Sequence, residues 1–158
     1  MAITIGKRQL KLILDRLDMV RIELLRLRAM LLPEEELDEE EKRELEEARK
    51  EIKEGYGVNL KDLIKELGWP KLFQIIVSRK ARKSIKRLPK HYRQRVINLL
   101  LLFRENPIPA EYYDVKKLRG YINTYRVRIG DIRIVYEISW NLRKVHVLLV
   151  EWRERVYS

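Results

Sequence analysis

Three arginines lie close together in the stretch "YRVRIGDIRIVYEI", residues 125–138. The Gly-Asp pair in its middle fits a two-residue hairpin turn of the II′ type, in which glycine takes the first position. Such a turn places Arg128 directly opposite Arg133, and the period-2 alternation of a strand puts Arg126 on the same face. Like charges that face each other across strands cost about 0.2–1 kcal/mol relative to a neutral pair. A patch that accepts this cost is expected to bind an anion.

Further basic and aromatic residues lie near this hairpin in the sequence. Arginine forks bind phosphate oxygens in pairs, and a tyrosine among them can stack on a base or exchange a proton. The preceding segment "VKKLRG" and the final segment "WRERVYS" supply both kinds of side chain. The candidate RNA-binding or catalytic residues are therefore Lys116, Lys117, Arg119, Arg126, Arg128, Arg133, Arg153, Arg155 and Tyr157.

Cleavage of RNA through its own 2′-OH needs a base for the hydroxyl proton, positive charge at the phosphorane and an acid for the 5′-oxygen. Arginines meet the second requirement but not the first, because guanidinium stays protonated. Tyr157 is the candidate for proton transfer. His91, at a helix start, and His146, on a strand, are poor partners for a His-pair mechanism. No metal-ligand spacing stands out, and no cofactor is expected.

The net charge of +11 is divided very unequally along the chain. Residues 1–70 carry a net charge of −3, residues 71–158 carry +14, and residues 33–68 alone carry −7. An acidic segment thus precedes a basic domain. The basic domain suggests a polyanionic partner such as nucleic acid, and the acidic segment is a candidate to occupy the same surface.

The composition also bounds the class of protein. A chain of 158 residues suffices for one ordinary domain or two small ones. It has no cysteine, which excludes disulfide and thiol chemistry, and it has no apolar run long enough to span a membrane. The N-terminus lacks a signal-peptide pattern. A soluble protein of the cytoplasm, without a membrane partner, is the expectation.

Apolar residues at alternating spacings of three and four predict a long helix over residues 7–32, ended by Pro33. Such a stripe cannot bury itself, so it needs a partner helix or a hydrophobic groove. Either dimerisation or binding to the rest of the chain would satisfy it. The stripe consists of Leu10, Ile13, Leu17, Val20, Leu24, Leu27 and Leu31.

Two further helices are expected before the basic domain. Asp38 and Glu41 form a capping-box pattern for an acidic helix over 38–54, with Gly55 as its C′ residue. A short helix follows at 60–67. Because apolar residues are sparse here, these helices are expected to lie across another surface as separate elements. The candidate contact residues are Leu45, Ile52, Leu60, Leu63 and Ile64.

Residues 69–158 predict a small α+β domain of the order β-α-α-β-β-β. A strand "LFQIIVS" precedes a basic helix at 79–88, which Ser78 caps, and a second helix follows at about 90–105. The β segments after the helices are expected at 122–129, 132–139 and 144–151, with 116–118 as a possible start. The helix pair is expected to cover one face of a small antiparallel sheet.

Residues 72–158 resemble the RelE toxins, especially their archaeal members. The motifs "LPKHYRQRV", "NPIPAEYYDVKKLRG", "YRVRIGDIRIVYEI" and "WRERVY" carry this resemblance in order across the domain. Residues from about 7 to 68 resemble RelB-type antitoxins through "LDMVRIELLRLRAMLLPEEE" and "EARKEIKEGYGVNLKDLIKELG". The resemblance implies a RelB-like antitoxin segment, 1–68, that wraps around a RelE-like toxin domain, 69–158.

The resemblance also implies an activity. RelE toxins are ribosome-dependent endoribonucleases that cut mRNA in the A site and leave a 2′,3′-cyclic phosphate. The family's functional residues fall here on Arg126, Arg128, Arg133, Arg153 and Tyr157. Where Arg126 and Arg128 stand, some members have lysines, which can lose a proton. The resemblance therefore leaves the general base open, and it implies that the antitoxin segment blocks the toxin in the same chain or from another copy.

Other functions remain possible from the sequence. The chain is either a toxin–antitoxin fusion with enzymatic activity or a non-catalytic regulator that dimerises through its first helix and binds operator DNA. A third possibility is a ParE-like inhibitor of DNA gyrase. The arginine set and Tyr157 favour the endoribonuclease.

Overall fold

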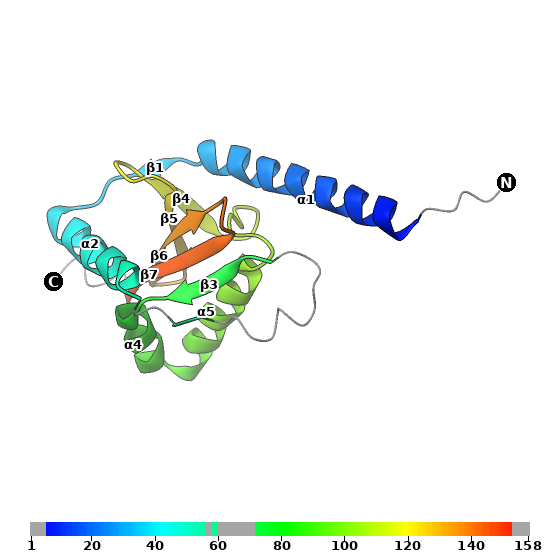
Figure 1. The fold of residues 1–158 in the computed structure, drawn as a ribbon. Coiled ribbons are helices and arrows are strands. Elements are labelled where there is room, and N and C mark those ends of the chain that lie inside the picture. The colour runs from blue at the N-terminus through cyan, green and yellow to red at the C-terminus, as the bar shows by residue number, and fades with distance from the viewer. Residues whose placement is uncertain (1–5, 56–57, 60–71, 153–158) are drawn as a thin grey trace.

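The computed structural model describes residues 6–55, 58–59 and 72–152, and within these residues seven strands form one sheet in the order β1-β4-β5-β6-β7-β3-β2 (Figure 1). The strands are β1 (Glu34–Glu35), β2 (Val58–Asn59), β3 (Gln74–Val77), β4 (Asp114–Leu118), β5 (Thr124–Ile129), β6 (Ile132–Ser139) and β7 (Lys144–Trp152). The helices are α1 (Lys7–Met30), α2 (Glu39–Lys53), α4 (Arg79–Arg87) and α5 (Lys90–Phe103).

The predicted α+β class is confirmed, with two differences in the sheet. Strand β4 is separate from β5, because the chain turns between them at Gly120 (φ +85°) and Asn123 (φ +53°). The domain therefore has one strand more than the predicted β-α-α-β-β-β order. Strands β4 to β7 are antiparallel as predicted, whereas β3 lies parallel to β7 and β1 lies parallel to β4.

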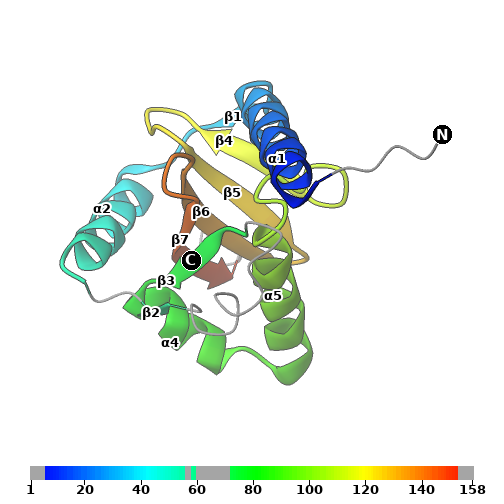
Figure 2. The same ribbon diagram turned by 45° about the vertical axis from the view of Figure 1, so that its right-hand side comes forward.

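One face of the sheet forms the main hydrophobic core. Helices α4 and α5 and the second half of α1 cover this face, on the side opposite to α2 (Figure 2). The alternating residues of β5 and β6 point into it, as period-2 patterning predicts. Its fully buried residues include Phe73, Val96, Leu99, Phe103, Val127, Ile134 and Tyr136.

Helix α2 covers the opposite face through a second, smaller cluster. Leu45 and Ala48 of α2 are fully buried there against Val135 and two leucines of β7. Those leucines, Leu148 and Leu149, are consecutive, and they share a face because the β6–β7 pairing shifts by one residue after Val135. The β-bulge thus gives the sheet a wider apolar surface for α2 than strict alternation would give.

The predicted helix boundaries agree with the local hydrogen bonds. Glu41 N donates to Asp38 Oδ1 at 2.8 Å and Glu41 Oε2 accepts from Asp38 N at 2.8 Å, which is the predicted capping box. Ser78 caps α4 by accepting from Ala81 N at 3.0 Å. Gly55 follows α2 with φ +85°. The first helix ends at Met30, and the predicted helix at 60–67 lies outside the described residues.

Helix α1 presents apolar residues on two sides. Ile22, Leu25 and Ala29 are buried in the main core. The predicted stripe from Leu10 to Leu31 lies on the other side, and its seven side chains are 45–85% exposed. The stripe therefore does not occupy a groove of its own chain. None of the described helices has the length and apolar character needed to cross a membrane.

A buried carboxylate joins α1 to the turn between β6 and β7. Asp18 is 4% exposed and forms ion pairs with Arg143 and, at 3.3 Å, with Arg21. Burial by itself raises the pKa of Asp18, but the hydrogen bonds and charges of the two arginines lower it below the ordinary value. The carboxylate is therefore ionised at neutral pH and holds α1 to the domain.

We expect Asp18→Asn to lower the free energy of unfolding at pH 7 by about 1–3 kcal/mol, because hydrogen bonds to charged groups contribute about that much. The wild-type contribution is complete above the ordinary carboxyl pKa of 3.8 and disappears as the pH falls through the lower folded pKa. Urea unfolding at pH 7 and at about pH 3 measures both effects.

The matched control is Glu23→Gln on the same helix, because the Glu23–Arg26 pair is exposed and its atoms lie 3.6 Å apart. The control should change the free energy of unfolding by less than about 0.5 kcal/mol at both pH values. Equal effects of Asp18→Asn and Glu23→Gln would contradict the anchoring role of Asp18.

Candidate nucleic-acid interface

The β5–β6 hairpin has the predicted register. Arg128 pairs with Arg133 and Ile129 pairs with Ile132 across the strands. Gly130 has φ +55°, the left-handed value that the first position of a II′ turn requires. The hairpin thus brings the three arginines to one face of the sheet, as its sequence predicts.

This face is not open to solvent, because residues of the N-terminal segment lie on it. Arg126 is fully buried, and its Nε donates to Glu35 Oε2 at 2.8 Å while its Nη1 donates to Asp114 Oδ2 at 2.9 Å. Arg128 Nη2 lies 3.5 Å from the other oxygen of Glu35. One carboxylate of β1 therefore bridges two arginines of β5. Arg126 is thus a buried, ion-paired side chain and not an exposed surface charge.

Arg133 is bound in the same way by α2. Its Nη1 lies 2.6 Å from Glu41 Oε1, and its Nη2 donates to Glu151 Oε2 at 3.0 Å. The second oxygen of Glu41 belongs to the capping box of α2, so this one carboxylate both caps the helix and binds Arg133. Each of the three arginines is thus paired with a carboxylate from residues 34–41.

The pKa shifts favour a charged Arg133 with charged Asp114 and Glu151. For Arg133, burial lowers the pKa, but its hydrogen bonds to Glu151 and Glu41 raise it above its ordinary value. For Asp114, burial raises the pKa, but the hydrogen bond and charge of Arg126 outweigh burial and lower the pKa below its ordinary value. Burial also raises the pKa of Glu151, while hydrogen bonds with Glu44 and Arg133 outweigh it. The face therefore stays a cationic surface with anionic side chains against it.

Three kinds of contact hold the acidic residues in place. Strand β1 extends the sheet at β4, with Lys117 N donating to Pro33 O at 2.8 Å and Arg119 N donating to Glu35 O at 2.8 Å. Leu45 of α2 supplies apolar burial on the same face. Ion pairs add a third kind of contact around β1 and α2, among them the pair of Arg119 and Glu34 at 3.0 Å. The carboxylates are therefore positioned by backbone, apolar and charged contacts together.

The remaining predicted site residues are placed as follows. Lys116 and Lys117 are half-buried on β4, and Arg119 is exposed at its end. Ile52 of α2 is partly buried against the second cluster. The residues outside the described part of the chain are Leu60, Leu63, Ile64, Arg153, Arg155 and Tyr157.

The two histidines do not join this face. His91 is exposed at the start of α5 with its ring against Tyr92, and His146 lies half-buried on β7, where burial and then the charge of Lys144 lower its pKa. Among the described residues, no group of His, Asp and Glu side chains could hold a metal ion.

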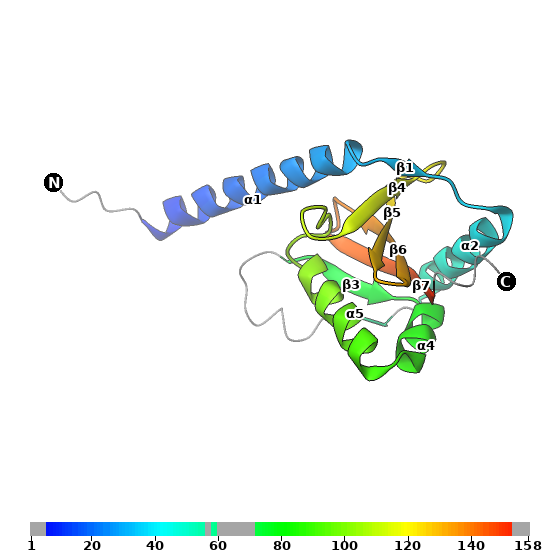
Figure 3. The same cartoon turned by 180° about the vertical axis from the view of Figure 1, so that it is seen from behind.

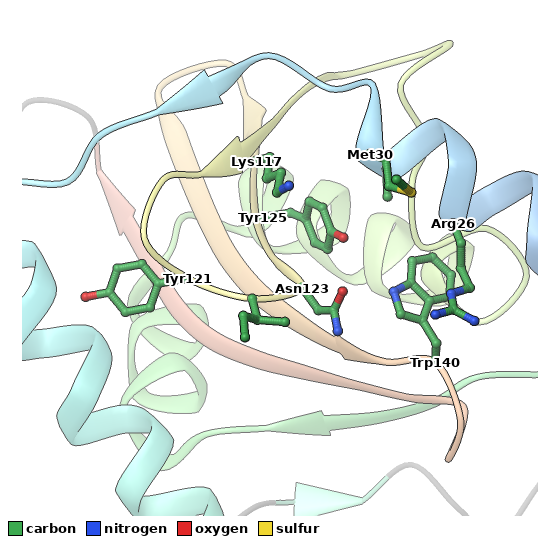
Figure 4. Close-up of a pocket in the computed structure, with 9 residues that line it drawn as sticks. Arg26, Met30, Lys117, Tyr121, Asn123, Tyr125 and Trp140 are labelled. Carbon is green, nitrogen blue, oxygen red and sulfur yellow. The ribbon is translucent and has the colours of Figure 1, made fainter.

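A cavity of about 260 Å³ lies at the margin of the main core, on the face of the sheet opposite the arginines, between α1 and the turn that follows β4 (Figure 4). Arg26 and Met30 of α1 line it together with Lys117, Tyr125 and Trp140. Tyr125 and Trp140 are almost completely buried, so they belong to the core and the cavity is a shallow junction between the N-terminal segment and the domain.

The sequence did not single out Glu35, Asp114 or Glu151 as members of the site. Glu35 lies within an acidic run, where one carboxylate cannot be told from the next. Only the net charges of the two halves of the chain indicated that some acidic residues would face the arginines.

Comparison with known proteins identifies toxins of toxin–antitoxin systems as relatives of this chain. A family model described as the ParE toxin of type II toxin–antitoxin systems, parDE, matches residues 75–157. The "Putative toxin RelE1" of Methanocaldococcus jannaschii is 33% identical over 86 residues, which is 54% of this chain and 96% of that protein. The "Toxin RelE3" of the same organism is 36% identical over 61 residues, 36% of this chain and 66% of that protein.

Among solved structures, the archaeal RelE–RelB complex from Pyrococcus horikoshii OT3 contains a chain 28% identical to this one, with a TM-score of 0.49. The match covers 52% of this chain and 97% of that chain. The RelB–RelE antitoxin–toxin complex from Methanococcus jannaschii contains a chain 26% identical, with a TM-score of 0.45, over 51% of this chain and 93% of that chain.

We expect Glu35→Gln combined with Glu41→Gln to strengthen binding of a single-stranded RNA oligonucleotide by about tenfold, since the three arginines then lose the carboxylates that the N-terminal segment sets against them and can bind phosphate instead. Fluorescence anisotropy at fixed salt measures the change. The matched control is Glu40→Gln with Glu47→Gln, which changes the net charge equally at two exposed positions of α2. An equal gain in both variants would mean that net charge alone causes the effect.

Proposed function

This chain belongs to the ParE/RelE toxin family of type II toxin–antitoxin systems, and we propose that residues 69–158 are a ribosome-dependent mRNA endoribonuclease that residues 1–68 keep inactive. The observation that carries the proposal is the pairing of Arg126, Arg128 and Arg133 with Glu35 and Glu41. An arginine face on a toxin domain, covered by acidic residues of the preceding segment, has the arrangement of a neutralised enzyme.

The arginines have a specific role in the proposed reaction. When the 2′-OH attacks the adjacent phosphorus, the phosphorane gains negative charge on its non-bridging oxygens, and fixed guanidinium groups stabilise that charge. Glu35 places two oxygens at 2.8 and 3.5 Å from Arg126 and Arg128, where two phosphate oxygens would lie. The Glu35 carboxylate thus stands in for a substrate phosphate.

The arginine donors are not all used by this carboxylate. Among the described residues, Arg126 Nη2 and Arg128 Nε are buried without a hydrogen-bond acceptor. Asp114 holds Arg126 from the domain's own side, so Arg126 remains positioned when Glu35 leaves. An RNA phosphodiester presents two charged oxygens, as the Glu35 carboxylate does, and its bridging oxygens are additional acceptors for these unused donors.

The arginines do not supply the general base, because guanidinium is protonated at all relevant pH values. We assign the proton transfer to Tyr157 and further phosphate contacts to Arg153 and Arg155. These assignments are based on the positions of the three residues in the terminal motif that resembles the family's. Lys116 pairs with Arg126 across β4 and β5 and extends the positive surface on this face, and Arg119 extends it beyond the end of β4. Lys117 pairs with Tyr125 and so lies on the opposite face of the sheet, away from the arginines.

Neutralisation in the same chain follows from the covalent link. Joining the two parts raises the effective concentration of the segment to the millimolar range, if the linker permits contact, so modest contacts suffice to keep the face covered. The same contacts can form with the segment of a second copy. Bound RNA and the acidic segment exclude each other because both occupy the arginine face.

The exposed stripe of α1 supports a further part of the proposal, a homodimer. Its seven apolar side chains from Leu10 to Leu31 follow the spacing of a coiled coil and face away from the domain. Pairing two copies through α1 covers the stripe and gives a two-fold symmetric regulator suited to operator DNA.

We expect residues 69–158 alone to cut ribosome-bound mRNA at least about tenfold faster than the full chain, because the arginine face is then free. In that fragment Arg133→Ala and Tyr157→Phe should each reduce cleavage by at least about a hundredfold, as losses of phosphorane stabilisation and of proton transfer commonly do. Primer extension on programmed ribosomes measures the rates, and circular dichroism checks that each variant folds.

Equal rates for the full chain and the fragment would contradict neutralisation in the same chain. Full activity of both variants would overturn the assignment of the site. Inhibition of gyrase supercoiling by the fragment, without mRNA cleavage, would favour the ParE-like alternative.

We expect the full chain to be a dimer, and Leu17→Glu combined with Leu24→Glu to make it a monomer, since two buried charges are incompatible with a coiled-coil seam. Light scattering after size exclusion gives the mass. The control is Met19→Glu, because Met19 is 65% exposed and lies outside the stripe. A monomeric wild-type chain would exclude the dimer.

A further inference from the structure

The hairpin formed by α4 and α5 is strongly basic, and the arginine face does not include it. Residues 79–104 contain ten Lys or Arg and no Asp or Glu. The two helices lie at one end of the molecule, with β1 and its Glu35 toward the other end (Figure 3). The positive charge of this chain is therefore divided between two separate surfaces.

The cations of α4 point in one direction. At about 100° per residue, the positions of Arg79, Arg82, Lys83, Lys86 and Arg87 fall within an arc of about 140° on the helix. The other side of α4 carries Ala81 and Leu88, which are buried in the main core. The packing of this apolar side fixes the basic side outward.

Most of these charges have no anionic partner within the part of the chain that the structure describes. Among the described residues, and apart from Arg95, which lies 6.0 Å from the centre of the Tyr92 ring, six exposed cations of the hairpin form no ion pair, which separates them from the paired arginines of the sheet. Only the start of α4 approaches α2, through Lys80 and Glu44 at 3.7 Å. The six are Arg82, Lys83, Lys86, Arg87, Lys90 and Arg93, and we call them the hairpin cations.

The sequence of α4 does nothing to relieve their repulsion. The pairs Arg79–Lys83, Arg82–Lys86 and Lys83–Arg87 place like charges four residues apart, an arrangement that destabilises a helix. The first turn of α4 also has no acidic residue to match the helix dipole. A ligand with a dense row of negative charges would remove this repulsion.

We propose that the hairpin cations form a docking surface for double-stranded RNA, which the full chain uses even while its arginine face is covered. The proposal rests on the proposed function, because a toxin that acts on ribosomes meets structured RNA before it meets the mRNA codon. Binding and inhibition are then separate: residues 1–68 block cleavage and leave docking intact.

The chemistry of the surface fits an RNA duplex. Duplex RNA is recognised mainly through phosphates and 2′-hydroxyls across its shape, and six mobile cations match phosphates without reading bases. Helix α4, with nine residues, is about 13 Å long, so its cations reach several phosphates of one strand. A membrane surface fits less well, because the side of α4 that would enter the lipid is already buried in the core.

The test measures anisotropy of a short fluorescent RNA duplex titrated with the full chain at several salt concentrations. The hairpin variant is Arg82→Gln, Lys83→Gln and Lys86→Gln. The matched control, Arg43→Gln, Lys50→Gln and Lys53→Gln, also removes one Arg and two Lys from exposed helix positions, on α2. Thermal unfolding checks that both variants remain folded.

We expect the hairpin variant to weaken duplex binding by about tenfold or more and to reduce the salt slope by about two to three, since each lost phosphate contact lowers it by about one. The control should bind within about twofold of wild type. Equal weakening of hairpin variant and control would overturn the proposal. So would tighter binding of the wild-type chain to phosphatidylglycerol vesicles than to the duplex.

This outcome is distinguishable from failure of the proposed function. The binding assay contains no ribosome and no cleavage step, so a chain that fails to bind the duplex can still cut mRNA once its arginine face is free. A chain that binds the duplex through the hairpin cations but never cuts mRNA would support the docking surface and contradict the endoribonuclease.

Discussion

The bridge that Glu35 makes between Arg126 and Arg128 determines how the two parts of this chain fit together. Arg126 is fully buried, and a buried guanidinium without carboxylate partners would cost several kcal/mol. Glu35 and Asp114 provide those partners from opposite directions, one from the N-terminal segment and one from the domain. The register of β1 on β4 brings Glu35 to these arginines, and α2, which follows β1, then covers the same face of the sheet.

The same bridge explains why the segment needs few residues to cover the face. Strand β1 has two residues, yet its backbone hydrogen bonds to β4 set Glu35 at the right height above β5. The capping box then fixes the first turn of α2, which sets Glu41 over Arg133. Local backbone hydrogen bonds thus position Glu35 and Glu41 against arginines that lie far away in the sequence.

Much of this arrangement could be predicted from local sequence. The Gly-Asp turn and the alternation of β5 and β6 gave the opposed arginines, because register follows from turn type. Asp38 with Glu41 gave the start of α2 for the same local reason. The separate strand β4, the parallel edge strands and the bulge at Leu148 were missed, because they depend on contacts between distant residues. Charge totals indicated that acidic residues would meet the arginines, but only the tertiary structure distinguishes Glu35 from its acidic neighbours.

The pairing of β1 with β4 affects the solubility of the domain when the N-terminal segment is removed. When β1 leaves, β4 becomes the edge of the sheet, with free N–H and C=O groups along one side. The departure of α2 also uncovers Leu118, Val135, Leu148 and Leu149 on the adjoining face. An open edge beside an apolar face is an aggregation hazard. In the full chain, β1 covers this edge and α2 covers this face, so the N-terminal segment shields both aggregation-prone surfaces of the domain.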